Sequence, residues 1–323
     1  MPAGSGERVF GCGETFSDFN LKGSTARIWA AEHQNLSRIL GKVIRNTFSK
    51  PRAERRQRFE KYETYYAQPT FTSSDKYFVH VDSDTYMEFC FGESEHMLYI
   101  HSLPKSLYIG MSDTYEGLSF SLSSVLGRQP LVPEWINDGL IIAVQGGTDT
   151  VIKKAKIARD SGIPLAGVWS QDWCGARITQ FGRQVMWNWE HDASLYPGLP
   201  KVMAELKEKG VRFLGYINPF MAIEGELYRY ATDKGYCIKD KNGKDYLATT
   251  TTFPAAMIDF TNPEAYEWYK SIIKKNLIGF GLDGWMADFG EYMPVDAVLF
   301  RSDDNEQTHN RWPALWAKLN REA

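Results

Sequence analysis

Asp288 is the side chain of this sequence most suited to chemistry, because it directly follows an apolar run in the segment GWMADFGEY. A carboxylate behind Trp285, Met286 and Ala287 is costly to bury unless a partner or a reaction requires it. The nucleophile of a retaining glycosidase is such a case, since it attacks the anomeric carbon and forms a covalent sugar ester. The alternative is a structural aspartate that caps a turn, a role that Asp283 at the start of the same run fits better. We therefore predict that Asp288 is catalytic.

A long aromatic loop, QDWCGARITQFGRQVMWNWEHDASLYPGL, is the second concentration of functional side chains. Its tryptophans are interleaved with basic and amide groups, namely Trp173, Trp187 and Trp189 beside Arg177, Arg183, Gln184 and His191. Aromatic faces next to amides and guanidinium groups suit a polyhydroxylated or anionic ring, so we predict that this loop binds a sugar. A histidine without a Cys or His partner at ligand spacing is more often a packing or surface residue, and His191 is interpreted in that way.

Strand-like apolar runs alternate with amphipathic helices from Pro133 onward, which is the pattern of βαβ units around a parallel sheet. The runs are GLIIAVQGG, PLAGVWSQDW, VRFLGYINPF and DGWMADFG, and Asn262-Pro263-Glu264 marks a helix start before the last of them. No GxGxxG or GxxxxGK[ST] motif follows any run, which disfavours a nucleotide-binding sheet. We predict an α/β fold with the first half of a (β/α)8-barrel, about four of its eight strand–helix units.

The active site of a β/α-barrel lies at the carboxyl ends of its strands. Polar side chains occupy those ends in each predicted unit: Gln145, then Gln171 and Asp172 with Trp173, then Asn218, then Asp288 with Glu291. We expect these side chains to converge on one site if the barrel closes.

Residues 9–127 read as β-rich, because short runs of aromatic and β-branched residues are separated by Ser, Asp, Gly and Pro. We expect part of a β-sandwich in residues 1–130 and the half-barrel in residues 131–323. A basic stretch at residues 38–61 could bind phosphate or nucleic acid, but the acidic overall balance favours a solvated loop.

Composition narrows the class of partner. The net charge is −3 with a pI near 6.1, which gives no reason to expect nucleic acid or an acidic membrane surface. The four cysteines are far apart and lack metal-ligand spacing, which predicts a reduced, cytoplasmic chain without disulfides, metal or cofactor. No apolar leader or run of about 18 apolar residues predicts a membrane segment. Aromatic residues reach 14 %, which fits either stacking on sugar rings or filling a β-rich core. A small-molecule glycoside is the expected partner, and a homo-oligomer stays open.

Several long motifs, in order along the chain, resemble glycoside hydrolase family 31, in the branch of the bacterial α-sulfoquinovosidases. They are FGCGETFSDFNLKG, LGRQPLVPEWINDG, GVWSQDWCGARITQFGRQVMWNW, GYINPF, DGWMADFGEYMPVD and THNRWPALWAKLNREA. The resemblance implies a retaining α-glycosidase that releases sulfoquinovose, a sulfonated glucose. It also implies that Asp288 is the nucleophile with Glu291 supporting it. By the same resemblance Gln145 and Gln171 contact sugar hydroxyls, and Trp187 donates to the sulfonate.

The sequence departs from that family pattern in two places. The sulfonate-binding arginine of the branch falls on Gln184, with Arg183 immediately before it; losing an ionic hydrogen bond costs about 1.5–3 kcal/mol. The general acid/base of the family lies on a later strand than any in these residues, so we expect an inactive fragment, truncated at both ends. The alternatives are an α-glucosidase or transglycosylase of the same family, and a non-catalytic sugar-binding fragment.

Overall fold

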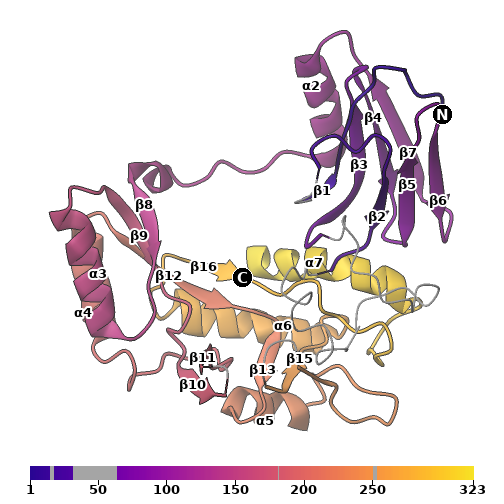
Figure 1. Cartoon of the computed structure of the whole chain (residues 1–323). Helices are drawn as coiled ribbons and strands as arrows, with labels where there is room; N and C mark the ends of the chain where they lie inside the picture. Colours follow the sequence, from indigo (N-terminus) through magenta and orange to yellow (C-terminus); the bar gives the residue numbers. More distant parts are fainter. Residues whose placement is uncertain (15–17, 32–63, 181, 250–252) are drawn as a thin grey trace. The chain divides into compact units, whose positions relative to one another are not determined.

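The computed structural model describes residues 1–14, 18–31, 64–180, 182–249 and 253–323, and the chain forms two compact units (Figure 1). The first unit comprises Met1–Pro130, Glu291–Asp296 and Asp303–Pro313, and the second comprises Leu131–Gly290, Ala297–Ser302 and Ala314–Ala323. The first unit therefore includes two later segments that the sequence had placed with the half-barrel. The basic stretch at residues 38–61 lies outside the described residues.

The first unit contains two antiparallel sheets whose inner faces share one core. One sheet has the order β1 (Val9–Gly13), β3 (Ala67–Ser73), β4 (Tyr77–Asp82) and β7 (Ser106–Met111). The other has the order β2 (Thr25–Ile28), β5 (Met87–Phe91) and β6 (His96–Ile100). Alternate residues of both sheets fill the core, including Phe71, Val79, Val81, Met87, Phe89 and Phe91. This two-sheet packing is the predicted sandwich-like arrangement.

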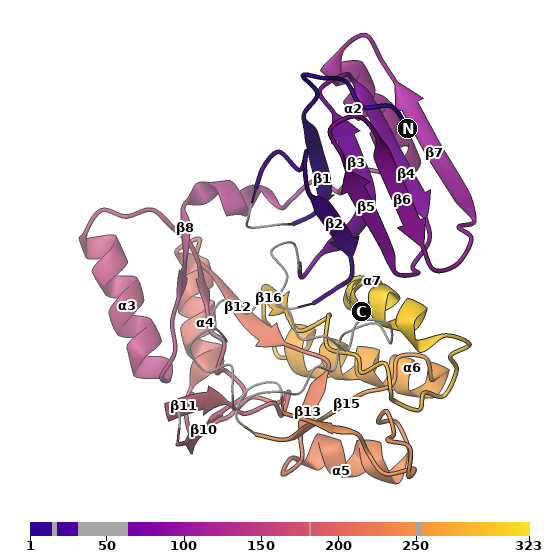
Figure 2. The ribbon, with the colours of Figure 1, turned by 45° about the vertical axis from the view of Figure 1, so that its right-hand side comes forward.

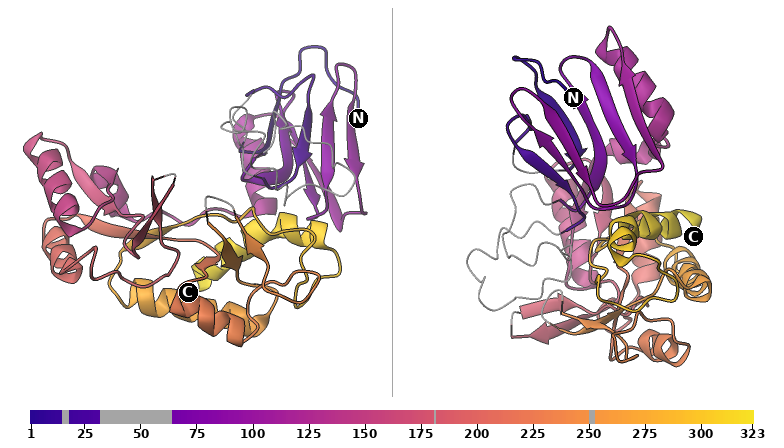
Figure 3. Two further views of the ribbon diagram at one scale, coloured as in Figure 1. Left: turned by 60° about the horizontal axis from the view of Figure 1, so that its bottom comes forward. Right: turned by 90° about the vertical axis from the view of Figure 1, so that its right-hand side faces the viewer.

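A helix closes this region, which the sequence had read as β-rich throughout. Helix α2 (Tyr115–Leu126) begins where the Thr114 hydroxyl accepts from the Gly117 amide at 3.0 Å, and it ends at Gly127 with φ of 82°. The helix packs against β4 and β7 (Figures 2 and 3). Only Leu118 of the helix is buried, so its sequence carries little helical periodicity.

The second unit is built on a four-stranded parallel sheet with the order β16, β12, β9, β8. Its strands are β8 (Leu140–Ala143), β9 (Leu165–Trp169), β12 (Arg212–Ile217) and β16 (Gly284–Ala287). The helices that follow them in turn are α3 (Thr148–Asp160), α4 (Leu199–Glu208), α6 (Pro263–Ile272) and α7 (Asn305–Glu322), of which α7 contributes residues to both units. The four predicted strand–helix units are confirmed.

Short elements are inserted at the carboxyl ends of the strands. A two-stranded hairpin, β10 (Ala176–Thr179) and β11 (Gly182–Val185), follows β9. After β12 come β13 (Phe220–Ala222), α5 (Glu226–Asp233), β14 (Leu247–Ala248) and β15 (Ala255–Met257), whose strands form a small antiparallel sheet. A 3₁₀ turn at Glu134–Asp138 precedes β8, and a π-helical turn at Ile273–Ile278 extends α6. The hairpin after β9 and the insertion after β12 place side chains over the strand ends.

The start of α6 follows the predicted capping pattern. The Asn262 side chain accepts from the Glu264 amide at 3.0 Å, and Pro263 occupies the first turn, where no backbone donor is needed.

The run before Asp288 is less buried than the sequence suggested. Met286 is 45 % exposed, and Trp285 is half-buried with its indole nitrogen donating to the Asn320 side chain at 2.8 Å. The reason is that β16 is an edge strand of its sheet and pairs only with β12. Burial of the preceding strand is therefore not what distinguishes Asp288.

Candidate active site

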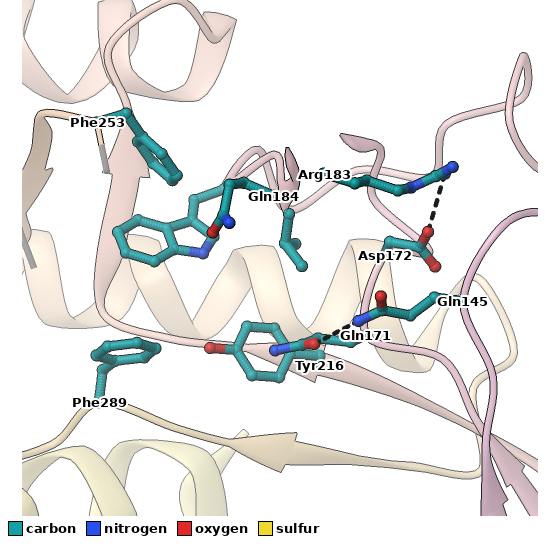
Figure 4. Close-up of a pocket in the computed structure, with 10 residues that line it drawn as sticks. Gln145, Gln171, Asp172, Arg183, Gln184, Tyr216, Phe253 and Phe289 are labelled. Carbon is teal, nitrogen blue, oxygen red and sulfur yellow. Dashed lines mark hydrogen bonds and ion pairs between the residues drawn. The ribbon is translucent and has the colours of Figure 1, made fainter. Parts of the chain in front are cut away.

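A pocket of about 470 Å³, partly open to solvent, lies at the carboxyl ends of the parallel strands (Figure 4). Its walls bring together polar and aromatic side chains from several elements, namely Gln145, Gln171, Asp172, Arg183, Gln184, Val185, Trp187, Tyr216, Phe253 and Phe289. The sequence had singled out the two strand-end glutamines, Asp172, the Arg183-Gln184 pair and Trp187; it had not singled out Tyr216, Phe253 or Phe289.

Two amides form one wall of the pocket. Gln145 follows β8 and Gln171 follows β9, each by two residues, so the register of neighbouring parallel strands brings them side by side. The Gln145 Nε2 donates to the Gln171 Oε1 at 2.6 Å (Figure 4). Since each amide has both donors and acceptors, the pair retains hydrogen-bonding capacity for the hydroxyl groups of a ligand.

Asp172 lines the pocket, and its side chain is almost fully buried. Its carboxylate accepts from the Gly146 amide at 3.0 Å, the Ser170 hydroxyl at 3.3 Å and the Tyr196 hydroxyl. It also forms an ion pair with Arg183, whose Nη2 lies 3.1 Å from Oδ2. With these donors in place, Asp172 is positioned to hold its neighbours rather than to bind a ligand through its own oxygens.

Arg183 is the one cationic side chain among the described residues that line the pocket. It lies on β11, where Ile178 is its cross-strand partner and Arg177 is the partner of Gln184. Its side chain is 40 % exposed, and one guanidinium nitrogen is held by Asp172. An arginine anchored in this way presents further N–H donors in a fixed plane.

Aromatic rings form the other end of the pocket. The Trp187 ring meets Phe253 edge-on at 4.7 Å and Phe289 at 5.4 Å between centroids, and it stacks on Phe220 at 5.3 Å. Phe289 has a φ of 60°, a left-handed conformation that is uncommon for a bulky residue. Such strained residues cluster at functional sites, and here the strain directly follows Asp288.

Asp288 lies one hydrogen bond from the pocket. The Tyr216 hydroxyl, which lines the pocket, donates to the Asp288 Oδ2 at 2.8 Å, and the Asp288 amide donates to the Ile217 carbonyl at 2.9 Å. Burial and then the negative charge of Asp288 raise the pKa of Tyr216 well above its ordinary value. Tyr216 therefore stays a neutral donor and fixes the orientation of the carboxylate.

Two tryptophans of the aromatic loop lie in the core. Trp173 is fully buried, its indole nitrogen donates to the Tyr216 carbonyl at 2.8 Å, and it is not among the described residues that line the pocket. Trp189 is likewise fully buried and donates to the Phe220 carbonyl at 2.9 Å. The two indoles thus donate to backbone carbonyls of β12 and β13, respectively, as a buried tryptophan requires.

The remaining candidates take structural positions. His191 lies 2.9 Å from the Tyr196 carbonyl and stacks on Phe280 at 4.6 Å, which is the packing role expected of it. Asp283 accepts from the Lys207 ammonium at 2.9 Å and from the Phe213 amide at 3.2 Å, which ties down the start of β16. Glu291 is buried at 9 % exposure and belongs to the first unit, outside the set of pocket-lining residues.

The described residues contain no group of three or more His, Cys, Asp or Glu side chains that could hold a metal ion. Within the same ranges, every helix is too short or too polar to cross a membrane.

Comparison with known proteins points to one family. Residues 129–323 match the family described as the glycosyl hydrolases family 31 TIM-barrel domain. The chain is 42 % identical over 98 % of its length to a sulfoquinovosidase of Escherichia coli K12, covering 46 % of that protein. It is 38 % identical over 97 % of its length to a sulfoquinovosidase of Agrobacterium fabrum, covering 47 % of it.

A solved structure gives the same result. A family 31 sulfoquinovosidase from E. rectale, in complex with an aza-sugar inhibitor, superposes with a TM-score of 0.89 at 42 % identity. The match covers 99 % of this chain and 48 % of that structure. The chain thus spans about half the length of the relatives it matches. With a family match over most of the second unit and this agreement in fold, the chain belongs to glycosyl hydrolase family 31.

Proposed function

We propose that this chain is part of a retaining α-glycosidase that hydrolyses α-sulfoquinovosides through a covalent glycosyl-Asp288 intermediate. One observation carries the proposal: the Asp288 carboxylate, oriented by the Tyr216 hydroxyl, stands at the edge of a pocket whose walls offer three amides and one cation. Two sulfoquinovosidases that this chain resembles, at 42 % and 38 % identity, support this substrate class.

The first chemical step is attack of an Asp288 oxygen on the anomeric carbon. A bond forms between that oxygen and the carbon while the bond to the aglycone oxygen breaks, and the leaving oxygen takes a proton from a second carboxyl group. Tyr216 keeps one Asp288 oxygen occupied, so the other oxygen is the attacking atom in this proposal. Water then releases the sugar by the reverse sequence at the same carbon.

The second carboxyl group is not supplied by the pocket walls. Retaining enzymes place their two carboxyl groups about 5–5.5 Å apart. Among the described residues that line the pocket, Asp172 is the one carboxylate, and it is engaged by Arg183 and by the Gly146 amide. We propose that the acid/base lies outside these 323 residues and that they bind the sugar without turning it over.

The sulfonate would be bound between Arg183, Gln184 and Trp187. Arg183 brings the charge, Gln184 a neutral amide and Trp187 an indole donor, and all three line the pocket. Because Arg183 is already held by Asp172, a sulfonate would meet a pre-oriented guanidinium group.

The direct test compares para-nitrophenyl α-sulfoquinovoside with para-nitrophenyl α-glucoside on this chain, following both turnover and heat of binding. We expect binding of the sulfonated sugar in preference to the neutral one, and no release of nitrophenol from either. Release of nitrophenol would contradict the assignment of the acid/base outside these residues. Absence of sugar binding by folded protein would contradict the assignment of the pocket.

Gln184 favours a second candidate, an α-glucosidase or transglycosylase of the same family. A neutral amide at this position suits a hydroxymethyl group as well as a sulfonate. Stronger binding of the neutral glucoside in the same comparison would select this candidate. Binding with no turnover by the complete protein would select the non-catalytic sugar-binding alternative.

We further propose the cytoplasm as the compartment. The support is that Cys12, Cys90, Cys174 and Cys237 are all free thiols, three of them buried. Burial raises the pKa of the Cys12, Cys174 and Cys237 thiols, which makes them poor nucleophiles for disulfide exchange.

A further inference from the structure

Arg177 lies behind the aromatic end of the pocket without lining it. Its guanidinium carbon is 3.9 Å from the centroid of the Phe253 ring, on the face of that ring. Phe253 lines the pocket, and the centroid of its ring lies 4.7 Å from that of the Trp187 ring (Figure 4). A continuous series of contacts therefore runs from the guanidinium group over the face of Phe253 to the indole, which Phe253 meets edge-on.

The guanidinium group is held in a fixed plane. Its Nη1 lies 2.7 Å from the Glu224 Oε1 and its Nη2 lies 3.2 Å from the Oε2, which is a two-point contact. Nη2 also lies 2.9 Å from the Met186 sulfur. The Arg177 side chain is only 15 % exposed, whereas Glu224 is 54 % exposed. An exposed carboxylate thus anchors a shielded cation, whose guanidinium carbon lies over the Phe253 ring.

The position of Arg177 on the β10–β11 hairpin places it beside a residue that lines the pocket. Arg177 on β10 is the cross-strand partner of Gln184 on β11, so the two side chains share one face of the hairpin. Gln184 lines the pocket and Arg177 does not. A change in Arg177 would therefore act on a bound sugar indirectly, through neighbours such as Phe253 and Gln184 that line the pocket.

We propose that Arg177 is a positioning residue, which holds Phe253 and thereby the Trp187 indole at the pocket wall and so sets the affinity for the sugar. The part of this inference that concerns affinity rests on the proposed function of the pocket; the part that concerns the position of Trp187 does not. The guanidinium plane is the required feature, because a cation stabilises an aromatic ring only when it is correctly placed over the ring face. Lysine keeps the charge but cannot make the two-point contact with Glu224.

Two variants separate the effect of the Arg177 charge from the effect of its planar guanidinium group. Arg177→Lys keeps the cation, and Arg177→Met keeps the length of the side chain without charge. Arg229→Lys is the matched control, because Arg229 pairs with Glu226 on the exposed surface of α5. The chain is labelled with 5-fluorotryptophan, and the ¹⁹F resonance of Trp187 is identified by its loss in Trp187→Phe.

We expect Arg177→Lys and Arg177→Met each to shift or broaden the Trp187 resonance and to weaken binding of para-nitrophenyl α-sulfoquinovoside by about fivefold in calorimetry. The Arg229→Lys control should change neither quantity. Glu224→Gln, which leaves Arg177 in place but loosens its anchor, should give a smaller effect in the same direction. Because Glu224 is exposed, Glu224→Gln still tests the inference if an Arg177 variant folds poorly.

An unshifted Trp187 resonance in the folded Arg177 variants would overturn the inference. A fall in melting temperature with an unchanged resonance and unchanged affinity would show a stabilising role only, and would overturn it equally. If the parent chain binds no sugar, the proposed function of the pocket fails, while the ¹⁹F measurement still decides whether Arg177 positions Trp187.

Discussion

Asp288 differs from the other carboxylates around the parallel sheet in having one oriented oxygen beside the pocket. Asp283 is tied to Lys207 and to a backbone amide, and Asp172 is saturated by donors. In contrast, the contact of Asp288 with Tyr216 leaves its other oxygen for chemistry. The difference between these aspartates is thus one of hydrogen-bonding partners, which the residue type alone does not reveal.

Asp288→Asn, introduced into the complete protein, should lower kcat by about a thousandfold or more, because the amide cannot form the glycosyl ester. Affinity for the sugar should change little, since Asn still accepts the Tyr216 hydrogen bond. Turnover of para-nitrophenyl α-sulfoquinovoside and calorimetry measure the two quantities. Asp283→Asn is the control, and it should lower stability and leave kcat within about twofold. Near-normal kcat in Asp288→Asn would remove Asp288 from the mechanism.

Arg183 and Gln184 give a second prediction at the scale of single residues, because they differ in charge at the same pocket wall. Arg183→Met should weaken binding of the sulfonated glycoside by about tenfold and that of the neutral glucoside by about twofold or less, since an ionic hydrogen bond is worth about 1.5–3 kcal/mol. Gln184→Arg should act in the opposite direction and raise the preference for the sulfonated sugar. Calorimetry with both glycosides gives the ratio of dissociation constants. An equal loss of affinity for both sugars in Arg183→Met would show that Arg183 stabilises the pocket wall through Asp172. It would then not contribute to recognition of the sulfonate charge.

At the scale of elements, strand ends predicted the site better than residue type did. Gln145, Gln171 and Arg183 reach the pocket because the alternation of strands and helices fixes where each strand stops and where the inserted hairpin stands. Trp173 does not reach it, because a tryptophan in a loop is equally able to fill the core beneath that loop. Tyr216 was missed because it lies inside an apolar run, where the sequence does not show which face its hydroxyl takes.

The inserted elements explain the rest of what the sequence could not predict. Phe253 comes from the insertion between β12 and β16, far along the chain from Trp187, and no local pattern links the two. Phe289 enters the pocket through a left-handed backbone conformation that its residue type does not suggest. Helix α2 was missed for a related reason, since a helix with one buried residue has little amphipathic signal.

Glu7 in the β-sandwich gives a prediction about how the stability of this element depends on pH. Glu7 is buried beside His96, which lies 3.1 Å away, and its carboxylate accepts from the Gly4 amide at 3.0 Å and from the Tyr77 hydroxyl. Burial by itself would raise the pKa of Glu7, but these hydrogen bonds, that from Ser73 and the charge of His96 together lower it below the ordinary value of 4.5. A lowered carboxyl pKa contributes stability above the unfolded-state pKa, and this contribution is lost as the pH falls through the folded-state pKa.

Glu7→Gln should therefore lower the free energy of unfolding by about 2 kcal/mol near neutral pH, the value of hydrogen bonds to a charged group. The difference from the parent should shrink as the pH falls below 4.5, because the unfolded parent then binds a proton at Glu7 before the folded parent does. Urea titrations across this range, with the exposed Glu93→Gln as a control, measure the difference. A gap between parent and Glu7→Gln that stays constant down to about pH 3 would contradict the role of the Glu7 charge.

At the scale of the whole molecule, the parallel sheet is the feature with the largest consequence. Within the residues that the structure describes, its four strands form an open sheet, in which β8 and β16 each pair on one side only. Both edge strands carry exposed apolar side chains, since Ile141 is 42 % and Met286 is 45 % exposed. An edge strand of this kind is a template for pairing with another chain.

We accordingly expect the purified chain to associate with a dependence on concentration. Sedimentation velocity should show a shift to larger species as the concentration rises, and Ile141→Lys and Met286→Lys should each reduce it, because a charge on an edge opposes strand pairing. Ile157→Lys is the matched control, since Ile157 is 50 % exposed but lies on α3, away from any sheet edge. A reduction by the helix variant equal to that of the edge variants would mean that general surface apolarity drives association. A concentration-independent monomer would mean that the side chains of β8 and β16 shield their own edges, and the open sheet would then be a stable end state of this chain.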